Sequence, residues 1–303
     1  MQRIVYVVFV LALLASCGPD LPEDLQELNK LEKELELQPS PERAISFLNK
    51  NIEYVNNHID DYELIKPQLL KGLSISKEQG MLSRAAGFLF PLLQNDQESE
   101  QFFSYAMDLG DVMYALNKKH VSNVVYKTLL AKNPNNSEIV SKSRLIDSSA
   151  LADDAYMQHL LEQIVVDPDE FGINKAAALK FVDAAEAFAL VDPDNSLVPE
   201  YLYRAAEAAR SRRDFAKALT IYDWLIADYP DHERAPTALF IKGFTIEQDL
   251  KRDEDARPIY EEFIAKYPDH QMRASVDFLL ENLGKSESEI LEVLQSKQSD
   301  QTQ

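Results

Sequence analysis

The stretches Ala218–Pro230 (ALTIYDWLIADYP) and Ala256–Pro268 (ARPIYEEFIAKYP) decide the fold of this chain. They repeat the same residue classes in the same order, at the 38-residue offset between Pro230 and Pro268, and both continue into Asp-His. The identical pairs are Ala218/Ala256, Ile221/Ile259, Tyr222/Tyr260, Tyr229/Tyr267 and His232/His270. A period of roughly 20–50 residues indicates stacked supersecondary units, which usually present extended surfaces to other chains. The repeat therefore favours binding over catalysis.

The composition favours helices and excludes some partners. Of 303 residues, 46% are hydrophobic and only 8 are glycine, so there is ample material for a core and little for a turn-rich β fold. The formal net charge of −20 disfavours nucleic acid and anionic membrane surfaces. It suits solubility or a partner with basic patches.

The N-terminus reads MQRIVYVVFVLALLASC, with a positive charge at Arg3 and an apolar run too short to span a bilayer. The sequence Leu14–Cys17 (LASC) resembles the bacterial lipobox. That resemblance implies that residues 1–16 are a lipoprotein signal peptide and that Cys17, the only cysteine, is acylated, as by palmitate, and becomes the mature N-terminus. Gly18 in place of Asp implies an outer-membrane anchor facing the periplasm. The alternative is an ordinary secretory signal cut near Ala15 or Cys17.

Beyond the N-terminus, helical patterns alternate with short polar breaks that often contain proline, which cannot continue a helix. The predicted helices span 21–37, 42–57, 62–78, 81–93, 98–117, 121–132, 147–165, 175–190, 199–211, 215–227, 235–250, 253–265 and 272–283. The first of these is predicted to pack on the following domain, because its leucine heptads are too few for a coiled coil.

The spacing of small, aromatic and proline residues resembles the tetratricopeptide repeat (TPR). One unit has Leu202, Ala206, Ala218, Tyr222 and Pro230; the next has Leu239, Gly243, Ala256, Tyr260 and Pro268, with one extra residue between its helices. An earlier unit keeps the spacing with Gly110, Ser122, Tyr126 and Pro134, and degenerate units are marked by Phe188 with Pro193 and by Ala86 with Phe90. The resemblance implies an all-α solenoid of antiparallel helix pairs, degenerate in its N-terminal and middle parts.

The predicted organisation follows from these patterns. After the signal peptide come a tether and amphipathic helix (17–39), degenerate TPR-like repeats (40–140), an irregular helical region (141–196), TPR repeats (197–296) and a disordered tail (297–303). Within a repeat, the small residues are expected to let two helices approach closely. The tyrosine fills space toward the next repeat, and the proline ends the second helix.

No pattern of catalytic, cofactor-binding or metal-binding residues emerges. No two glycines are close enough for a dinucleotide, nucleophile-elbow or P-loop motif. His232-Glu233 begins a zinc-protease motif, but Pro236 stands where the second histidine belongs. A calcium loop beginning at Asp167 lacks its final acidic ligand, since Ala178 occupies that position. We predict no enzyme, no cofactor and no metal.

The TPR resemblance implies that the first helix of each repeat lines a concave, partner-binding face. Carried over by position, the groove residues are Tyr203, Glu207, Arg210, Phe240, Phe244 and Glu247. Phe240 and Phe244 share a helix face and could hold apolar side chains of a partner. The alternative is that both are buried against the next repeat or the C-terminal helix.

The segment beginning Val198-Pro-Glu-Tyr, followed by two Tyr-Pro-Asp-His turns, resembles TPR lipoproteins of Gram-negative envelopes. The resemblance implies a membrane-anchored scaffold that binds protein partners in envelope assembly or cell-wall coordination. The membrane is contacted only through the lipid on Cys17, and nucleic acid is not bound. The alternative is a substrate-binding envelope lipoprotein of a nutrient uptake system, which would need a deep aromatic pocket.

Overall fold

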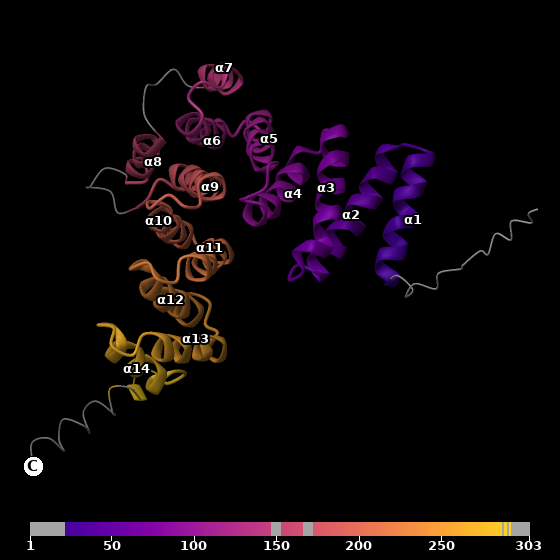
Figure 1. The fold of residues 1–303 in the computed structure, drawn as a ribbon. Helices are drawn as coiled ribbons and strands as arrows, with labels where there is room; N and C mark the ends of the chain where they lie inside the picture. Colours follow the sequence, from indigo (N-terminus) through magenta and orange to yellow (C-terminus); the bar gives the residue numbers. More distant parts are fainter. Residues whose placement is uncertain (1–21, 147–152, 166–171, 287, 290, 292–303) are drawn as a thin grey trace, which may run out of the picture. The chain divides into compact units, whose positions relative to one another are not determined.

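A computed structural model describes residues 22–146, 153–165, 172–286, 288, 289 and 291. Over these residues the chain is all-helical, with fourteen α-helices and one π-helix, and its only β feature is an isolated bridge between Val165 and Ile173. The all-α solenoid of adjacent helix pairs is thereby confirmed (Figure 1). The predicted lipidation site Cys17 and the predicted tail 297–303 lie outside the described residues.

The helices fall into two compact units, residues 1–88 and 89–303. The first unit contains α1 (Glu23–Leu37), α2 (Pro41–Asn57), α3 (Tyr62–Glu78) and the first half of α4 (Leu82–Asn95). α1 packs on α2 and buries Leu28, while α2 packs on α3. Ser40 and Asp61 cap α2 and α3 by accepting hydrogen bonds from backbone N–H groups of their first turns.

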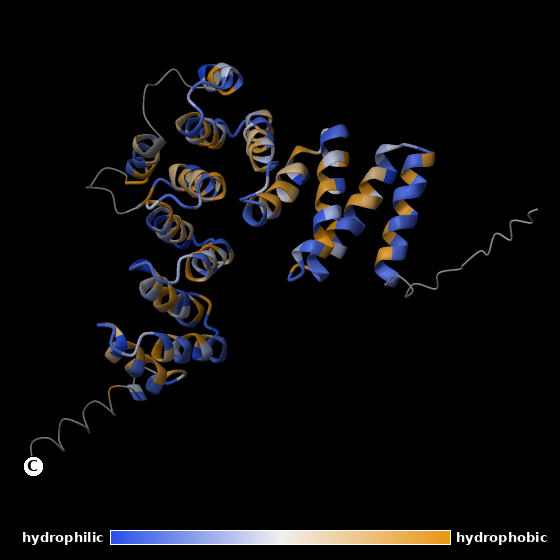
Figure 2. Ribbon diagram, in the orientation of Figure 1, coloured by the Kyte–Doolittle hydropathy of each residue, from blue (hydrophilic) through white to orange (hydrophobic). Residues whose placement is uncertain are grey.

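The second unit contains the remaining elements in chain order. They are α5 (Phe102–Ala115), α6 (Lys119–Lys132), α7 (Ser137–Ile146), α8 (Asp153–Glu162), α9 (Lys175–Val191), α10 (Val198–Ser211), α11 (Phe215–Asp228), α12 (Arg234–Phe244), the π-helix η1 (Thr245–Asp249), α13 (Asp253–Lys266) and α14 (Arg273–Asn282). From α8 onward each helix packs on the next, and α9 also packs on α6. Apolar residues gather along the helices and hydrophilic ones in the connecting turns (Figure 2).

Three turns between paired helices of the second unit hold a non-glycine residue with positive φ. Asn117, Arg213 and Lys251 have φ of 60°, 66° and 57°, the left-handed region that ends a helix and lets the chain reverse. Each residue lies shortly before the second helix of its pair, α6, α11 or α13. The repetition of this turn keeps the three hairpins alike.

Most predicted helix bounds agree with the structure to within a few residues, and three differences are informative. The sequence patterns do not predict α7. Its first turn is capped by Oδ1 of Asn136, which accepts hydrogen bonds from the backbone N–H groups of Glu138 and Ile139, and the side chain of Ile139 is buried. The helix predicted at 147–165 is confined to α8, Asp153–Glu162, among the described residues. The helix predicted at 235–250 is α-helical only to Phe244 and continues as η1.

Candidate partner-binding face

The second unit is built on contacts between a small residue and an aromatic ring of the paired helix. A Cβ placed on Gly243 would lie 2.7 Å from Cε1 of Tyr260, and one on Gly110 would lie 2.6 Å from Cε1 of Tyr126. Both distances are shorter than any normal carbon–carbon contact, so only glycine fits without a shift. The helices therefore meet where the sequence pattern places its small residue.

The sixteen-residue spacing of Gly110 and Tyr126 occurs twice more. Ala206 and Tyr222 have it, and these two residues are fully buried in one core cluster. In the first unit, a Cβ on Gly72 would collide with the ring of Phe88. The sequence pattern places a degenerate repeat there at Ala86 and Phe90, so its aromatic residue is two positions after Phe88. It misses the Gly72–Phe88 pair because no proline follows that pair at the repeat spacing.

Each of these tyrosines also donates its hydroxyl to a carboxylate on the first helix of its pair. Tyr260 donates to Oε2 of Glu247 at 2.6 Å, Tyr126 donates to Oδ1 of Asp111 at 2.5 Å, and Tyr222 donates to Oε1 of Glu207. Burial, followed by the neighbouring carboxylate, raises the pKa of all three hydroxyls above its usual range. The tyrosines therefore remain neutral donors.

The π-helix η1 absorbs the extra residue of the repeat unit that runs from Leu239 to Pro268. Gly243 and Tyr260 are seventeen residues apart rather than sixteen, and the additional residue widens the end of the helix at Thr245–Asp249. As a result, the acid that meets Tyr260 is Glu247, four residues after Gly243, whereas Glu207 directly follows Ala206. Glu247 is only 8% exposed, so this predicted groove residue faces its own helix pair.

Three predicted groove residues contact one another in series, and a fourth lies one helical turn away on α10. Glu207 and Arg210 lie three residues apart on α10, and the guanidinium of Arg210 stands 5.6 Å from the ring centre of Phe244. The rings of Phe244 and Phe240 have centres 6.2 Å apart on α12. With Tyr203, one helical turn before Glu207, these residues are called the α10–α12 strip. The strip thus joins two adjacent repeats.

Two ion pairs fix the ends of the α10–α12 strip. Arg210 donates through Nε to Oδ2 of Asp249 at 2.8 Å, which connects α10 to η1. At the other end, Arg234 donates to both oxygens of Glu200, at 2.5 and 3.1 Å, and lies 4.8 Å from the ring centre of Tyr203. Burial opposes ionisation of Glu200, but the hydrogen bonds from Arg234 and Arg204 lower its pKa.

The two phenylalanines of the strip are half-buried. They are therefore neither fully open to a partner nor fully buried against the next repeat. Phe240 packs against the core cluster of the last repeat, with its ring centre 6.4 Å from that of Phe263. Phe244 carries Arg210 on its face and remains partly accessible. Tyr203 is only 8% exposed, so this predicted groove residue is largely buried. Phe244, Arg210 and Glu207 are therefore the reachable part of the strip.

The remaining packing residues lie as follows. Ala218 and Ala256 are fully buried, and Pro230 and Pro268 are exposed just after the ends of α11 and α13. The hydroxyl of Tyr229, beside Pro230, donates to the carbonyl of Pro193 at 2.9 Å, which ties the turn after α11 to the turn before α10. In the two turns, Nδ1 of His232 accepts a hydrogen bond from the backbone N–H of Arg234, and Nδ1 of His270 accepts one from Met272. These histidines therefore stabilise the turns.

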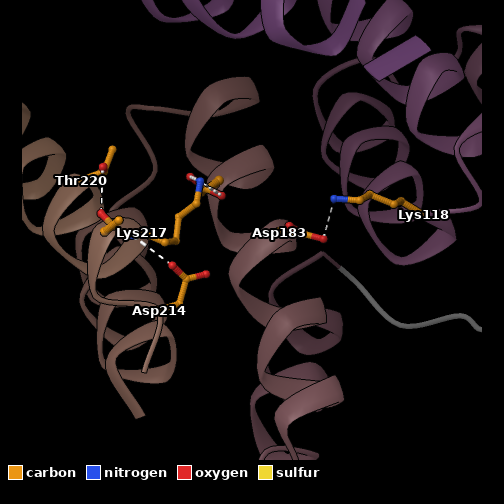
Figure 3. Close-up of polar contacts among 7 residues, drawn as sticks. Lys118, Asp183, Asp214, Lys217 and Thr220 are labelled. Atoms are coloured by element: carbon orange, nitrogen blue, oxygen red, sulfur yellow. Dashed lines mark hydrogen bonds and ion pairs between the residues drawn. The ribbon is translucent and has the colours of Figure 1, made fainter. Parts of the chain in front are cut away.

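α9 links the α5–α6 hairpin to the α10–α11 hairpin through two acids (Figure 3). Lys118 donates to Oδ2 of Asp183 at 2.8 Å, and Lys217 donates to Oε1 of Glu186 at 2.9 Å. His120 lies 3.6 Å from Asp183, beyond hydrogen-bond distance, so that contact is electrostatic. Burial opposes ionisation of Asp183, yet these neighbours lower its pKa; burial raises the pKa of Glu186.

Comparison with known proteins agrees with this geometry. The family model of the tetratricopeptide repeat matches residues 200–232 and 237–270. The chain carries two tetratricopeptide repeats. The α10–α12 strip lies within them, and these repeats suggest a scaffold for protein–protein interaction. The α5–α6 hairpin shares the glycine–tyrosine contact although it lies outside the matched residues. No curated protein matches the chain.

Other site types find no support in the part of the chain that the structure describes. There, no three His, Cys, Asp or Glu side chains come together as metal ligands. Within the same residues, no helix has the length and apolarity needed to cross a membrane. Sequence reasoning missed the partners Glu200, Asp249 and Arg234, because pairs 34 and 39 residues apart leave no local pattern.

Proposed function

We propose that this chain is a lipid-anchored scaffold of the bacterial periplasm, which holds protein partners for envelope assembly or cell-wall coordination. The observation that carries the proposal is the α10–α12 strip, a partly accessible face that joins two tetratricopeptide repeats. The lipobox-like sequence ending at Cys17 supports the anchor. Anchoring by more than one acyl chain is stable, because each buried CH₂ contributes about 0.8 kcal/mol.

The anchor is tested by labelling cells with radioactive palmitate. The wild-type chain is expected to incorporate label and to fractionate with the outer membrane, whereas Cys17→Ser is expected to lose both properties. A Cys17→Ser variant that still incorporates palmitate would refute the lipidation site. Spheroplast proteolysis then reports whether the repeats face the periplasm.

Partner binding is tested by site-specific photo-crosslinking in intact envelopes. A photoreactive phenylalanine analogue at Phe244 is expected to capture discrete protein partners. The same analogue at Leu179, an exposed apolar position on α9, serves as the matched control. Identical products from both positions, or none from Phe244, would contradict binding through the strip. If the captured partners were components of a transporter, the nutrient-uptake alternative would be favoured instead.

A further inference from the structure

The charges along the α10–α12 strip are unevenly compensated. Its cation Arg210 is paired with Asp249, and the neighbouring Arg234 is paired with Glu200. Glu207 differs, because its only polar partner among the described residues is the neutral hydroxyl of Tyr222, on Oε1. No cation lies within ion-pair distance of its carboxylate in that part of the chain. Glu207 is half-buried, and its Oε2 is not among the described side-chain oxygens that are buried without a hydrogen-bond partner, so this oxygen is reachable from solvent.

The geometry around Glu207 holds this carboxylate in place. Tyr222 is fully buried, and burial together with Glu207 itself raises the pKa of its hydroxyl, which therefore stays a proton donor. The hydroxyl fixes one carboxylate oxygen without neutralising its charge. A carboxylate that is held in place and has no cationic partner favours a cationic ligand, because little conformational entropy is lost when the ligand binds.

An apolar surface lies next to this carboxylate. Arg210, three residues after Glu207, covers one face of Phe244, and Phe240 continues the surface along α12. Because Arg210 is held by Asp249, it does not add a net positive charge that would repel a cation at Glu207. The strip therefore offers a negative charge on α10 and an aromatic surface on α12.

Building on the proposed function, we propose that the α10–α12 strip binds a segment of a partner protein that carries Lys or Arg close to a bulky apolar side chain. The basic group pairs with Oε2 of Glu207, and the apolar side chain packs on Phe244 and the exposed part of Phe240. The net charge of −20 adds long-range attraction for such a basic segment.

The test is selection from a random twelve-residue peptide library displayed on phage, with the purified chain that begins at Cys17 immobilised. The selected peptides are expected to share a Lys or Arg near Phe, Leu, Ile or Met. Acidic or uncharged selected peptides that bind at the strip would overturn this inference while leaving the scaffold function standing. A library that yields no binders would count against both.

Variants then locate the binding site. Using fluorescence anisotropy with one selected peptide, Glu207→Gln is expected to weaken binding by about tenfold, as loss of one charge-assisted contact predicts. With a peptide in which the basic residue is replaced by Gln, Glu207→Gln should cause no additional loss of affinity. Glu261→Gln, at an exposed position on α13, is the matched control and should leave the affinity unchanged. Equal effects of the two substitutions would refute the role of Glu207.

The aromatic half of the site is tested with Phe244→Ala, checked by circular dichroism, and with Phe244→Leu in case the alanine variant unfolds. Either variant is expected to weaken the peptide by tenfold or more, in line with a buried aromatic anchor. Leu179→Ala is the control on another exposed apolar side chain. Full affinity in folded Phe244 variants would place the peptide elsewhere and overturn the inference, although peptide binding itself would still support a scaffold.

Discussion

Replacing Gly243 by alanine tests the contact that brings α12 and α13 together. The new methyl group would lie 2.7 Å from Cε1 of Tyr260 and 3.3 Å from Cγ2 of Ile259. In an open helix position, alanine is more stable than glycine by roughly 0.5–1 kcal/mol. Overpacking a core opposes this and costs about 1–3 kcal/mol. We expect overpacking to win, because Tyr260 is fully buried and fixed by its hydrogen bond to Glu247.

The expected result for Gly243→Ala is a net loss of about 1–2 kcal/mol in the free energy of unfolding. Urea unfolding followed by fluorescence measures it, because Trp224 is the only tryptophan and packs in the repeat that adjoins α12. Gly87→Ala is the matched control, since a Cβ added to that helical glycine would have no neighbouring atom within 4 Å. Measured by circular dichroism, it should gain roughly 0.5–1 kcal/mol.

A double-mutant cycle identifies the ring as the cause. In a Tyr260→Leu background the ring is absent, so Gly243→Ala is expected to become neutral or stabilising. The reasoning is refuted if Gly243→Ala stabilises the wild-type chain as Gly87→Ala does. It is equally refuted if the cost persists unchanged without the tyrosine ring.

Three further predictions concern packing and charge. Tyr260→Phe should lower stability by about 1–3 kcal/mol in urea unfolding, because buried Glu247 loses its hydroxyl donor. Asp183→Asn should cost on the order of 1 kcal/mol at pH 7. Because the folded-state pKa of Asp183 is lowered from 3.8, that difference should shrink as the pH falls below 3.8, as unfolding curves at several pH values would reveal. Ala256→Leu should cost about 1–3 kcal/mol by overpacking and lower Tm, whereas Ala265→Leu, at an exposed position of α13, should not.

Each of these three predictions has a control variant or a result that would contradict it. Tyr114→Phe removes a hydroxyl from an exposed ring and should leave stability unchanged, so an equal loss at both tyrosines would contradict the role of Glu247. A stability difference for Asp183→Asn that is constant from pH 3 to pH 7 would mean that its charge plays no part. An unchanged Tm in Ala256→Leu would argue against close helix packing at that position.

Much of the fold could be predicted from the sequence, for a local reason. A helix pair is specified by residues within one repeat, so the spacing of Gly243, Ala256 and Pro268 predicted the hairpin and the close approach of its helices. Tyr260, which was expected to fill space toward the next repeat, instead packs against Gly243 of its own pair. α7 escaped prediction because its cap at Asn136 is followed by a short and largely polar helix. The π-helix escaped as well, since the sequence indicated an extra residue but not which segment would widen to hold it.

The candidate site was predictable only in part. Repeat positions selected Glu207, Arg210, Phe240, Phe244, Tyr203 and Glu247. The sequence alone, however, could not distinguish the reachable carboxylate of Glu207 from the buried one of Glu247, because both occur at repeat positions that line a groove. That difference depends on which hydroxyl and which cation each acid meets across the helix pair.

The sequence by itself therefore determined the repeat, its helical pairing and the residues that could face a partner, because these depend on spacing along one chain. Tertiary structure decided which charges are compensated. The pairs Arg210–Asp249 and Arg234–Glu200 join residues 39 and 34 positions apart, and Glu207 has only a neutral hydroxyl for a partner among the described residues. Charge compensation depends on distances between side chains from different helices, and folding alone sets those distances.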